Sequence, residues 1–461
     1  MRDGVRRLAL VTGVCFVILT VHLTYIQAVA GEKLYLNPLN PRLRQVEQQN
    51  LRGTILDRAG RVLARTTGNP GTFQRQYPYG PAAAGVVGYV SQRLGSNGLE
   101  AARDGDLLGL QGWQRLLNQG RRLTGKAAYG NDLVLTLDAD LQRLAADLLA
   151  GRRGAVVALE PATGAVLALA SSPSFDPNRL EEEWPRINSP AAGSPLLNRA
   201  VQGQYPPGSI MKLITATAAL EADPAVLERQ FFCPGYLEVQ GWRLTCPRPH
   251  GRLDLQQAMM YSCNVTFATL ALEAGADKFR ATAGLYGFDK PLDFDLPVAG
   301  SRLPDHLDAN ALAEAAIGQG AVLATPLQMA MVTAAIANRG ILMQPYLVAR
   351  VTVPGGRLLE QATPRPLQVV AGARTAAAIS DAMVAAVNGG TAAAAALPGI
   401  PVAAKTGSAQ NPHGEAHAWL VAFAPAAQPQ VAVAVVVENA GAGGVVAAPI
   451  AREIMAAALR R

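Results

Sequence analysis

The residues best suited to covalent chemistry lie in the stretch YPPGSIMKLITATAA, residues 205–219. Pro206-Pro207-Gly208 breaks any preceding helix, and the residues after it have helical composition without another Gly or Pro. We therefore expect Ser209 at the mouth of a helix and Lys212 one turn further on, because side chains three apart share a helix face. A serine becomes a nucleophile when a neighbouring base takes its proton, and a desolvated lysine can be that base.

Lysine is rare in this chain, which strengthens the interpretation of Lys212. Only six of the 41 basic residues are Lys. Arg does not deprotonate in proteins, whereas the pKa of a buried Lys shifts readily, so lysine is expected where a neutral amine is needed. A Ser-x-x-Lys pair alone remains a weak signal, because a capping serine beside a solvated lysine gives the same pattern.

Two further motifs carry polar side chains at positions that can serve the same site. Tyr261-Ser262-Cys263-Asn264 follows 53 residues after Ser209, counted to Ser262. A hydroxyl can relay a proton, and the Asn amide offers a donor and an acceptor to a substrate amide. By itself this motif also fits a helix cap.

The second motif, Lys405-Thr406-Gly407-Ser408, lies on a predicted strand over residues 402–408. Gly407 allows close approach of a ligand or backbone. Lys405 supplies a positive charge suited to a substrate carboxylate, and an exposed strand edge can bind an extended peptide by strand addition.

The elements that must position these motifs form an α+β pattern. A hairpin of two apolar strands over residues 154–170 comes first, and both strands are expected to be buried on both faces. A helical region interrupted by loops follows from Ser209 to about Val387. Three strands and a closing helix end the chain, at residues 402–408, 418–424, 431–438 and 447–460. This order predicts one sheet covered by helices, an α+β layered architecture.

The N-terminal part predicts a membrane anchor and a small extracytoplasmic domain. Residues 8–30 form an apolar run long enough to span a bilayer. Arg2, Arg6 and Arg7 precede it, which predicts a cytoplasmic N-terminus and an exported remainder. A cleaved signal peptide ending at Ala28-Val29-Ala30 is the alternative, and the length of the run favours a retained anchor.

We divide the chain into a tail and anchor (residues 1–30), a β-rich pedestal (31–136) and a main domain (137–461). In the pedestal, two short strands around an Asp/Gly turn are expected within residues 51–64. The net charge of +7 fits a membrane surface or cell-wall polyanions, and 5% aromatic residues with no recognised binding motif argue against nucleic acid.

Taken together, the motifs resemble those of the class B penicillin-binding proteins, the monofunctional peptidoglycan D,D-transpeptidases of bacteria. Ser-x-x-Lys, Ser-x-Asn and Lys-Thr-Gly occur here in the order that marks this fold. The resemblance runs nearly end to end and includes Asn40-Pro41-Arg42, Arg52-Gly53-Thr54-Ile55-Leu56-Asp57-Arg58, Gly98-Leu99-Glu100, Gly318-Gln319-Gly320 and residues 418–425. The short pedestal is similar to that of smaller members, without a glycosyltransferase segment. The resemblance implies an α+β main domain of the penicillin-binding and serine β-lactamase type, with an antiparallel sheet, helices on both of its faces and an inserted helical subdomain.

This resemblance implies a role for each motif residue. Ser209 is the expected acylated nucleophile and Lys212 its base; Ser262 relays the proton to the leaving amine, and Asn264 holds the substrate amide. Lys405 and Thr406 are expected to bind the substrate carboxylate on the strand that also carries Gly407. The backbone N–H groups of Ser209 and Ser408 would form the oxyanion hole. Ser408 stands where members often carry Thr.

The resemblance also implies the substrates and partners. Stem peptides of peptidoglycan are crosslinked through the acyl-enzyme, β-lactam antibiotics stall it, and no cofactor or metal is required. A polytopic glycan polymerase of the shape, elongation, division and sporulation (SEDS) group is the implied membrane partner. A D,D-carboxypeptidase or β-lactamase-type hydrolase and a non-catalytic penicillin sensor are the alternatives. The residues do not distinguish elongation, division and sporulation roles.

The cysteines predict a structural role. Cys233 and Cys246 lie thirteen residues apart in the exported part, where a disulfide is permitted, and we expect one. A zinc site that adds His250 is not expected, because no fourth ligand is apparent. Cys263, between Ser262 and Asn264, is expected to be a buried thiol.

Overall fold

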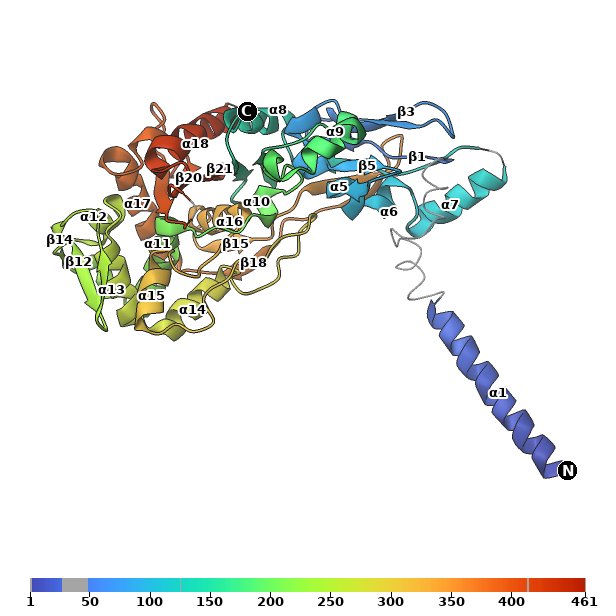
Figure 1. Ribbon diagram of the computed structural model, residues 1–461, viewed down its shortest axis with the longest axis horizontal. Coiled ribbons are helices and arrows are strands. Elements are labelled where there is room, and N and C mark those ends of the chain that lie inside the picture. Colours follow the sequence, from blue (N-terminus) through green and yellow to red (C-terminus); the bar gives the residue numbers. More distant parts are fainter. Residues whose placement is uncertain (1, 27–48, 125, 413, 461) are drawn as a thin grey trace.

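The computed structural model describes residues 2–26, 49–124, 126–412 and 414–460. Helix α1 (Arg2–Tyr25) stands apart from the folded body (Figure 1). Within the described ranges it is the one helix long and apolar enough to cross a membrane, with a mean hydropathy of 2.0 and no buried residue in its apolar window. It coincides with the predicted anchor, of which residues 27–30 lie outside the described residues.

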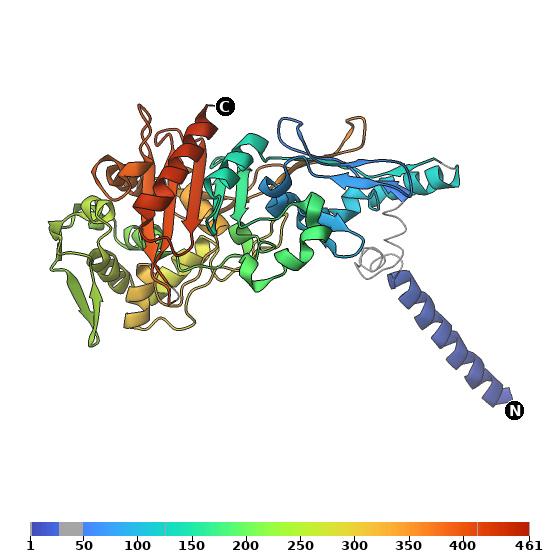
Figure 2. The same ribbon diagram turned by 45° about the horizontal axis from the view of Figure 1, so that its top comes forward.

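A five-stranded antiparallel sheet forms the centre of the main domain (Figure 2), with strand order β10-β9-β21-β20-β19. Its strands are β9 (Gly154–Leu159), β10 (Val166–Ser172), β19 (Ala403–Ala409), β20 (His417–Ala424) and β21 (Val431–Val437). Every residue of β9 and β21 is buried, as expected for apolar strands covered on both faces. The predicted hairpin and the three later strands are therefore confirmed.

Two hydrophobic cores lie on opposite faces of this sheet. On one face, Ala155 and Val157 pack with α16 (Pro326–Ala337). On the other, Val156 and Ala158 pack with α18 (Gly443–Leu459) and α8 (Ala139–Leu148). Because successive side chains of a strand point to opposite faces, one continuous apolar run serves both cores. β19 lies at an edge of the sheet.

The expected helical region between Ser209 and about Val387 is mixed rather than helical. Its helices are the 3₁₀ helices η5 (Gly208–Met211) and η6 (Pro224–Glu228) and the α-helices α11 (Lys212–Ala222), α12 (Leu255–Met260), α13 (Asn264–Ala274), α14 (Ala276–Leu285), α15 (Ala309–Ala316), α16 and α17 (Ala373–Gly389). Eight short strands lie among them: β11 (Phe231–Cys233), β12 (Tyr236–Val239), β13 (Trp242–Thr245), β14 (Gly251–Leu253), β15 (Ile341–Met343), β16 (Val348–Thr352), β17 (Leu358–Gln361) and β18 (Pro366–Val369). They are three to five residues long, too short for a clear period-two pattern.

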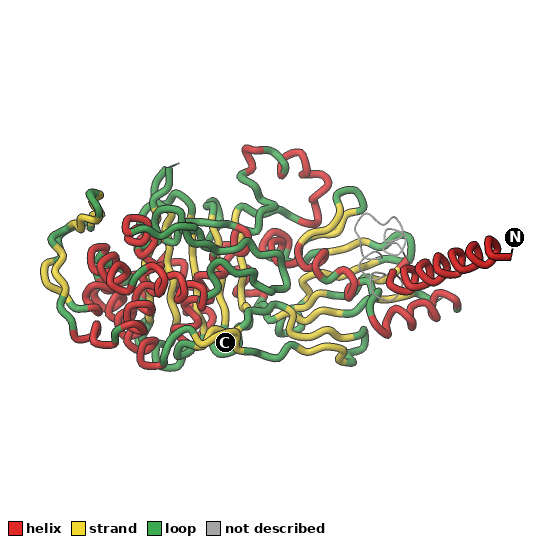
Figure 3. The backbone as a smooth tube through the Cα atoms, turned by 90° about the horizontal axis from the view of Figure 1, so that it is seen from below, coloured by secondary structure: helices red, strands yellow, loops and turns green. Residues whose placement is uncertain are grey.

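A second, six-stranded sheet has the order β17-β16-β8-β2-β3-β4 and lies in the other half of the body (Figure 3). The pedestal contributes β1 (Asn50–Leu51), β2 (Ile55–Leu56), β3 (Val62–Thr67), β4 (Gln74–Gln76), β5 (Tyr89–Ser91), β6 (Gly95–Asn97), β7 (Ala128–Tyr129), β8 (Asp132–Leu135), α4 (Ala84–Val87), α5 (Gly98–Ala102), α6 (Asp104–Leu107) and α7 (Gly112–Leu123). The predicted β2–β3 pair is confirmed, with Gly60 at φ 84° in its turn. β16 pairs with β8, so a later part of the chain completes this sheet.

The pedestal core contains a buried ion cluster. Arg52 Nε lies 2.5 Å from Glu100 Oε2, and Arg75 Nε lies 2.7 Å from Glu100 Oε1. Arg52 is 6% exposed and Glu100 is fully buried. Such charges are tolerated because each is paired, and removal of one partner would leave the others uncompensated. The two N-terminal motifs that carry Arg52 and Glu100 therefore meet in space. Two further short α-helices are α9 (Leu180–Ile187) and α10 (Arg199–Gln202).

Candidate active site

Ser209 lies in the 3₁₀ helix η5, which leads directly into α11. Residues i and i+3 eclipse each other in a 3₁₀ helix, so Ser209 and Lys212 lie on the same side of the chain. Gly208 begins the turn at φ 59°, a conformation that favours glycine. A Cβ at Gly208 would also lie only 3.2 Å from Ala409 on β19, so this turn packs tightly against the strand.

Lys212 is fully buried, and its amine donates three hydrogen bonds to the turn between α12 and α13. Nζ lies 2.6 Å from the Ser262 carbonyl oxygen, 3.1 Å from Ser262 Oγ and 2.7 Å from Asn264 Oδ1. Within the described ranges the Ser209 hydroxyl makes no hydrogen bond, to Lys212 or to any other group. Catalytic contacts of this kind commonly tighten only when substrate binds.

Burial lowers the pKa of Lys212 to about 7, an effect that negative charge on Cys263 and Cys246 partly opposes. In the described part of the chain no carboxylate forms an ion pair with this amine. Lys405 is equally buried, and burial together with the charge of Lys212 brings its pKa well below the usual range. The two amines compete for positive charge, so at neutral pH a base is available at the site.

Ser262 lies between the two amines. Lys405 Nζ donates to Ser262 Oγ at 2.8 Å, and Lys212 Nζ approaches the same oxygen. Ser262 adopts φ 56°, which is unfavourable for a residue other than glycine and is typical of functional sites. Asn264 Nδ2 donates to the Thr245 carbonyl oxygen at 2.8 Å, which turns Asn264 Oδ1 toward Lys212.

β19 carries the Lys-Thr-Gly motif at the sheet edge, beside η5. Thr406 Oγ1 donates to Thr391 Oγ1 at 2.8 Å, and Gln319 Nε2 donates to the Ser408 carbonyl oxygen at 3.5 Å. A Cβ at Gly407 would lie 2.9 Å from the Pro207 carbonyl oxygen and 3.0 Å from the Trp419 Cβ. Gly407 therefore allows β19 and η5 to approach closely.

Two contacts hold the turn before Ser209 in place. Trp419 Nε1 donates to the Pro206 carbonyl oxygen at 3.0 Å, and the Trp419 ring is fully buried. The Gly208 N–H donates to the Gly318 carbonyl oxygen at 2.8 Å. Gly318 adopts φ 73°, and a Cβ there would lie 2.1 Å from the Gly208 carbonyl oxygen. These contacts explain why the Gly-Gln-Gly segment has glycine at position 318 and the Ala-Trp-Leu segment has tryptophan at position 419.

Seven of the eight predicted residues gather at one open cleft, and the eighth, Gly407, lies on β19 where that strand packs against η5. Ser209, Ser262, Asn264, Thr406 and Ser408 line it, together with residues of the β12–β13 hairpin and α15. Lys212 and Lys405 lie beneath its floor, where both bind Ser262. The arrangement places a hydroxyl, a base, a proton relay and an unpaired strand edge at one surface. Such a site can carry out acyl transfer on an extended peptide.

Three contributors were missed by the sequence analysis. Thr391 binds Thr406, Thr245 orients Asn264, and Glu314 lines the cleft from α15. Thr245 acts through its backbone carbonyl, so its residue type carried no signal. Thr391 and Glu314 lie in no recognisable motif.

The expected Cys233–Cys246 disulfide does not form, because both thiols are free in the structure. Cys246 Sγ lies instead 3.7 Å from Cys263 Sγ, the thiol between Ser262 and Asn264. Cys263 is fully buried, as expected.

Comparison with known proteins gives consistent similarities along the whole chain. Residues 154–456 match the family model of the penicillin binding protein transpeptidase domain, and residues 52–133 match that of the penicillin binding protein A dimerisation domain. The chain is 38% identical to the peptidoglycan D,D-transpeptidase PbpA of Mycolicibacterium smegmatis, over 100% of this chain and 99% of that protein.

Solved structures of penicillin-binding proteins are also similar to this chain over most of its length. A ceftriaxone acyl-enzyme complex of penicillin-binding protein A from M. tuberculosis superposes with a TM-score of 0.85 at 36% identity, and covers 90% of this chain and 100% of that one. Pseudomonas aeruginosa PBP2 gives a TM-score of 0.76 at 31% identity, over 89% and 96% of the two chains.

Proposed function

Since this chain belongs to the class B penicillin-binding proteins, which are peptidoglycan D,D-transpeptidases inhibited by penicillins, we propose that Ser209 is its acylated nucleophile. The observation that carries the assignment is the buried Lys212 amine, one 3₁₀ turn from Ser209 and bonded to Ser262 and Asn264. A lysine with a pKa of about 7 can accept a proton at neutral pH.

In the acylation step, Ser209 Oγ attacks the carbonyl carbon between the two D-Ala residues of a stem peptide. The hydroxyl proton passes to Lys212 Nζ while the C–Oγ bond forms. The C–N bond then breaks, and the departing D-Ala amine takes up a proton through the Ser262 hydroxyl, which lies within hydrogen-bond distance of Lys212. A β-lactam follows the same course, but its leaving amine stays tethered, so the adduct persists.

Two backbone amides would stabilise the oxyanion. The Ser209 N–H opens η5, where amides of the first turn lack helical partners. The Ser408 N–H lies on edge strand β19 beside it. Loss of one such donor commonly costs about 3–4 kcal/mol of transition-state stabilisation. The substrate would extend along β19, with its carboxylate held by Lys405 and Thr406.

In the second step, a side-chain amine of a neighbouring stem peptide attacks the acyl carbonyl, and Ser209 regains its proton through Lys212. A hydrolase would instead need a group that activates water. Glu314 is the carboxylate that lines the cleft among the described residues, so it is the candidate for that role. If Glu314→Gln shortened or left unchanged the lifetime of the penicillin adduct, hydrolysis through Glu314 would be excluded.

We also propose the topology and the domain division. Positive charge at Arg6 and Arg7 before the apolar stretch of α1 supports a cytoplasmic N-terminus. The family-model matches at residues 52–133 and 154–456 fall inside the proposed pedestal (31–136) and main domain (137–461). The family resemblance supports a SEDS-type polymerase as the membrane partner of this chain, which copurification of the full chain would test.

The nucleophile is tested by incubating the full-length protein in detergent with a fluorescent penicillin. We expect a long-lived adduct that disappears in Ser209→Ala and persists in Ser96→Ala, a substitution at an exposed serine of β6. Incubation with a stem pentapeptide and an acceptor amine should release D-Ala and form the crosslinked product. An adduct in Ser209→Ala would contradict Ser209 as the nucleophile. D-Ala release without crosslinking would contradict the transfer to an acceptor amine.

A further inference from the structure

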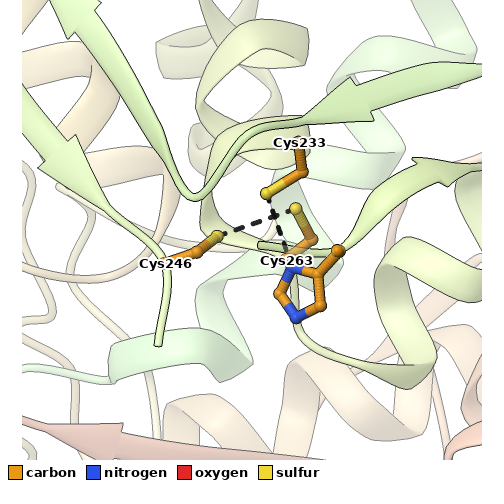
Figure 4. Close-up of side chains that lie close together, drawn as sticks. Cys233, Cys246 and Cys263 are labelled. Atoms are coloured by element: carbon orange, nitrogen blue, oxygen red, sulfur yellow. Dashed lines mark hydrogen bonds between the residues drawn. The ribbon is translucent and has the colours of Figure 1, made fainter. Parts of the chain in front are cut away.

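Three cysteines and one histidine converge beside the active site (Figure 4). Their ligand atoms, one from each of Cys233, Cys246, His250 and Cys263, all lie within 4.8 Å of one another. They come from four separate places: the end of β11, the loop after β13, the segment before β14 and the N-cap of α13. The sequence analysis excluded a zinc site for want of a fourth ligand, and the structure supplies Cys263 as that ligand.

The spacing of these atoms fits a tetrahedral metal site. With Zn–S near 2.3 Å and Zn–N near 2.05 Å, tetrahedral angles place two sulfurs about 3.8 Å apart and a sulfur and a nitrogen about 3.6 Å apart. Cys246 Sγ and Cys263 Sγ are separated by 3.7 Å, and Cys233 Sγ and His250 Nδ1 by 3.5 Å. A disulfide would require about 2.05 Å between sulfurs.

The sulfurs are also surrounded by hydrogen-bond donors, as thiolates require. The N–H groups of Asn264 and Val265 donate to Cys246 Sγ at 3.1 and 3.4 Å. The Thr266 N–H and hydroxyl donate to Cys263 Sγ at 3.5 and 3.3 Å. Cys263 caps the N-terminus of α13, where the helix dipole favours negative charge. These donors are independent of the sulfur spacing and point to the same anionic sulfur cluster.

The surrounding segment has little apolar core of its own. β12 and β13 form a two-stranded pair in which Val239 and Leu244 are the buried residues, while Tyr236 and Trp242 are 42% and 37% exposed. A two-stranded pair of this kind is marginal alone, and small units of this kind are commonly held by a metal. Cys233 and Cys263 are fully buried, whereas Cys246 and His250 are partly exposed and leave a route for the ion.

We propose that Cys233, Cys246, His250 and Cys263 bind one Zn²⁺ ion, which fixes the β12–β13 hairpin to the turn that carries Ser262 and Asn264. On binding, the three thiols release their protons to solvent and the His250 Nδ1 lone pair completes the tetrahedron. The ion plays no part in the reaction itself. It positions Asn264, because Thr245, next to Cys246, accepts the Asn264 Nδ2 hydrogen bond. This positioning role rests on the proposed function, whereas zinc binding does not.

Metal content tests the site directly. The full-length protein is purified in detergent without chelator, with a phosphine reductant, and its metals are measured by mass spectrometry. We expect about one zinc per chain in the wild type. Cys233→Ser and His250→Ala should weaken zinc binding by at least about 100-fold. The matched control is Cys15→Ser, which removes the exposed thiol of α1 and should retain zinc.

Replacing zinc by cobalt(II) tests the site in the wild-type chain, so the result does not depend on whether a variant folds. In the wild-type chain, Co²⁺ should give thiolate-to-metal charge-transfer absorption together with the intense visible bands of tetrahedral cobalt. A protein without stoichiometric metal, with iron or copper in place of zinc, or with a Cys246–Cys263 disulfide would overturn the proposal. Absence of the tetrahedral cobalt spectrum would overturn it as well.

The positioning role has a separate readout. Removal of zinc by a chelator should slow acylation by fluorescent penicillin at least about 10-fold, and return of zinc should restore it. Ser209→Ala should bind zinc like the wild type while forming no adduct. Unchanged acylation after zinc removal would overturn the positioning role. A zinc-loaded wild type that forms no adduct would refute the proposed function and leave the metal site standing.

Discussion

Replacing Lys212 by Arg tests whether catalysis depends on a neutral amine. Arg keeps the positive charge and the hydrogen-bond donors but does not deprotonate in proteins. General-base catalysis typically contributes about 10²–10⁴-fold, so we expect acylation of Lys212→Arg to fall by that factor. Lys212→Met, which fits the same fully buried space without a base, should show a similar loss.

The pKa of Lys212 sets the expected pH dependence. At a pKa of about 7, about half of the amine is neutral at pH 7. An amine with the usual pKa of 10.5 would be neutral in only about 0.03% of molecules at that pH, about 1600-fold less. The neutral form is the reactive one, so the acylation rate should rise with pH, level off above about pH 8 and show its midpoint near 7.

The assay follows the second-order rate constant for fluorescent penicillin acylation of the full-length protein between about pH 5.5 and 10. This range brackets a pKa of about 7 and extends toward the usual amine pKa of 10.5. The control is Lys290→Arg, at an exposed lysine, which should match the wild type. A wild-type midpoint near 10, or a Lys212→Arg protein that keeps its rate, would refute a neutral Lys212 as the base. Thermal unfolding of each variant separates loss of the base from loss of the fold.

Three further predictions concern a close backbone approach, a buried hydrogen bond and the pedestal ion cluster. Gly407→Ala should slow acylation at least about 10-fold, because its Cβ would meet backbone at 2.9 Å, whereas Gly284→Ala, with open space around it, should not. Trp419→Phe removes the 3.0 Å hydrogen bond to the turn before the nucleophile and should cost about 1–3 kcal/mol of unfolding free energy, read from chemical denaturation. Glu100→Gln leaves two arginines without their buried carboxylate and should cost about 3–5 kcal/mol, so an unchanged melting temperature would contradict the ion cluster. Burial alone would raise the pKa of Glu100, but the charges of Arg75 and Arg52 outweigh it and lower the pKa, so this stabilisation is complete above the unfolded value near 4.3 and is lost as pH falls.

The parts of the fold that could be predicted were those with a long, uniform signal. The continuous apolar runs of β9 and β21 identify strands buried on both faces, and the hydropathy of α1 identifies a helix long and apolar enough to span a membrane. The strands β11–β18 gave no such signal, since they are short and several are largely exposed. Pairing of β16 with β8 joins residues more than 200 positions apart, and local pattern does not encode such partners.

Prediction of the site was limited in the same way, because contacts between residues distant in the sequence leave no local pattern. Ser209, Lys212, Ser262 and Lys405 were predicted as site residues because their types and spacing suit acyl-transfer chemistry. Cys263 was interpreted from its neighbours alone, as a buried thiol. Its role depends on three ligand atoms brought together by separate strands, which only the fold reveals.

The placement of Ser262 between two buried amines constrains the protons of the site. Each amine lies within hydrogen-bond distance of the one hydroxyl oxygen, at 3.1 Å for Lys212 and 2.8 Å for Lys405. When Lys212 is neutral, its two N–H bonds suit the Ser262 carbonyl oxygen and Asn264 Oδ1. The Ser262 hydroxyl can then donate its hydrogen bond to the lone pair of the Lys212 nitrogen. Lys405, whose pKa burial and the charge of Lys212 bring well below the usual range, donates to the Ser262 hydroxyl oxygen through an N–H bond that both its neutral and its charged form possess. If the substrate carboxylate lies beside Lys405, as we propose, it would favour positive charge on Lys405. That charge would disfavour a second one on Lys212 when Ser209 must lose its proton.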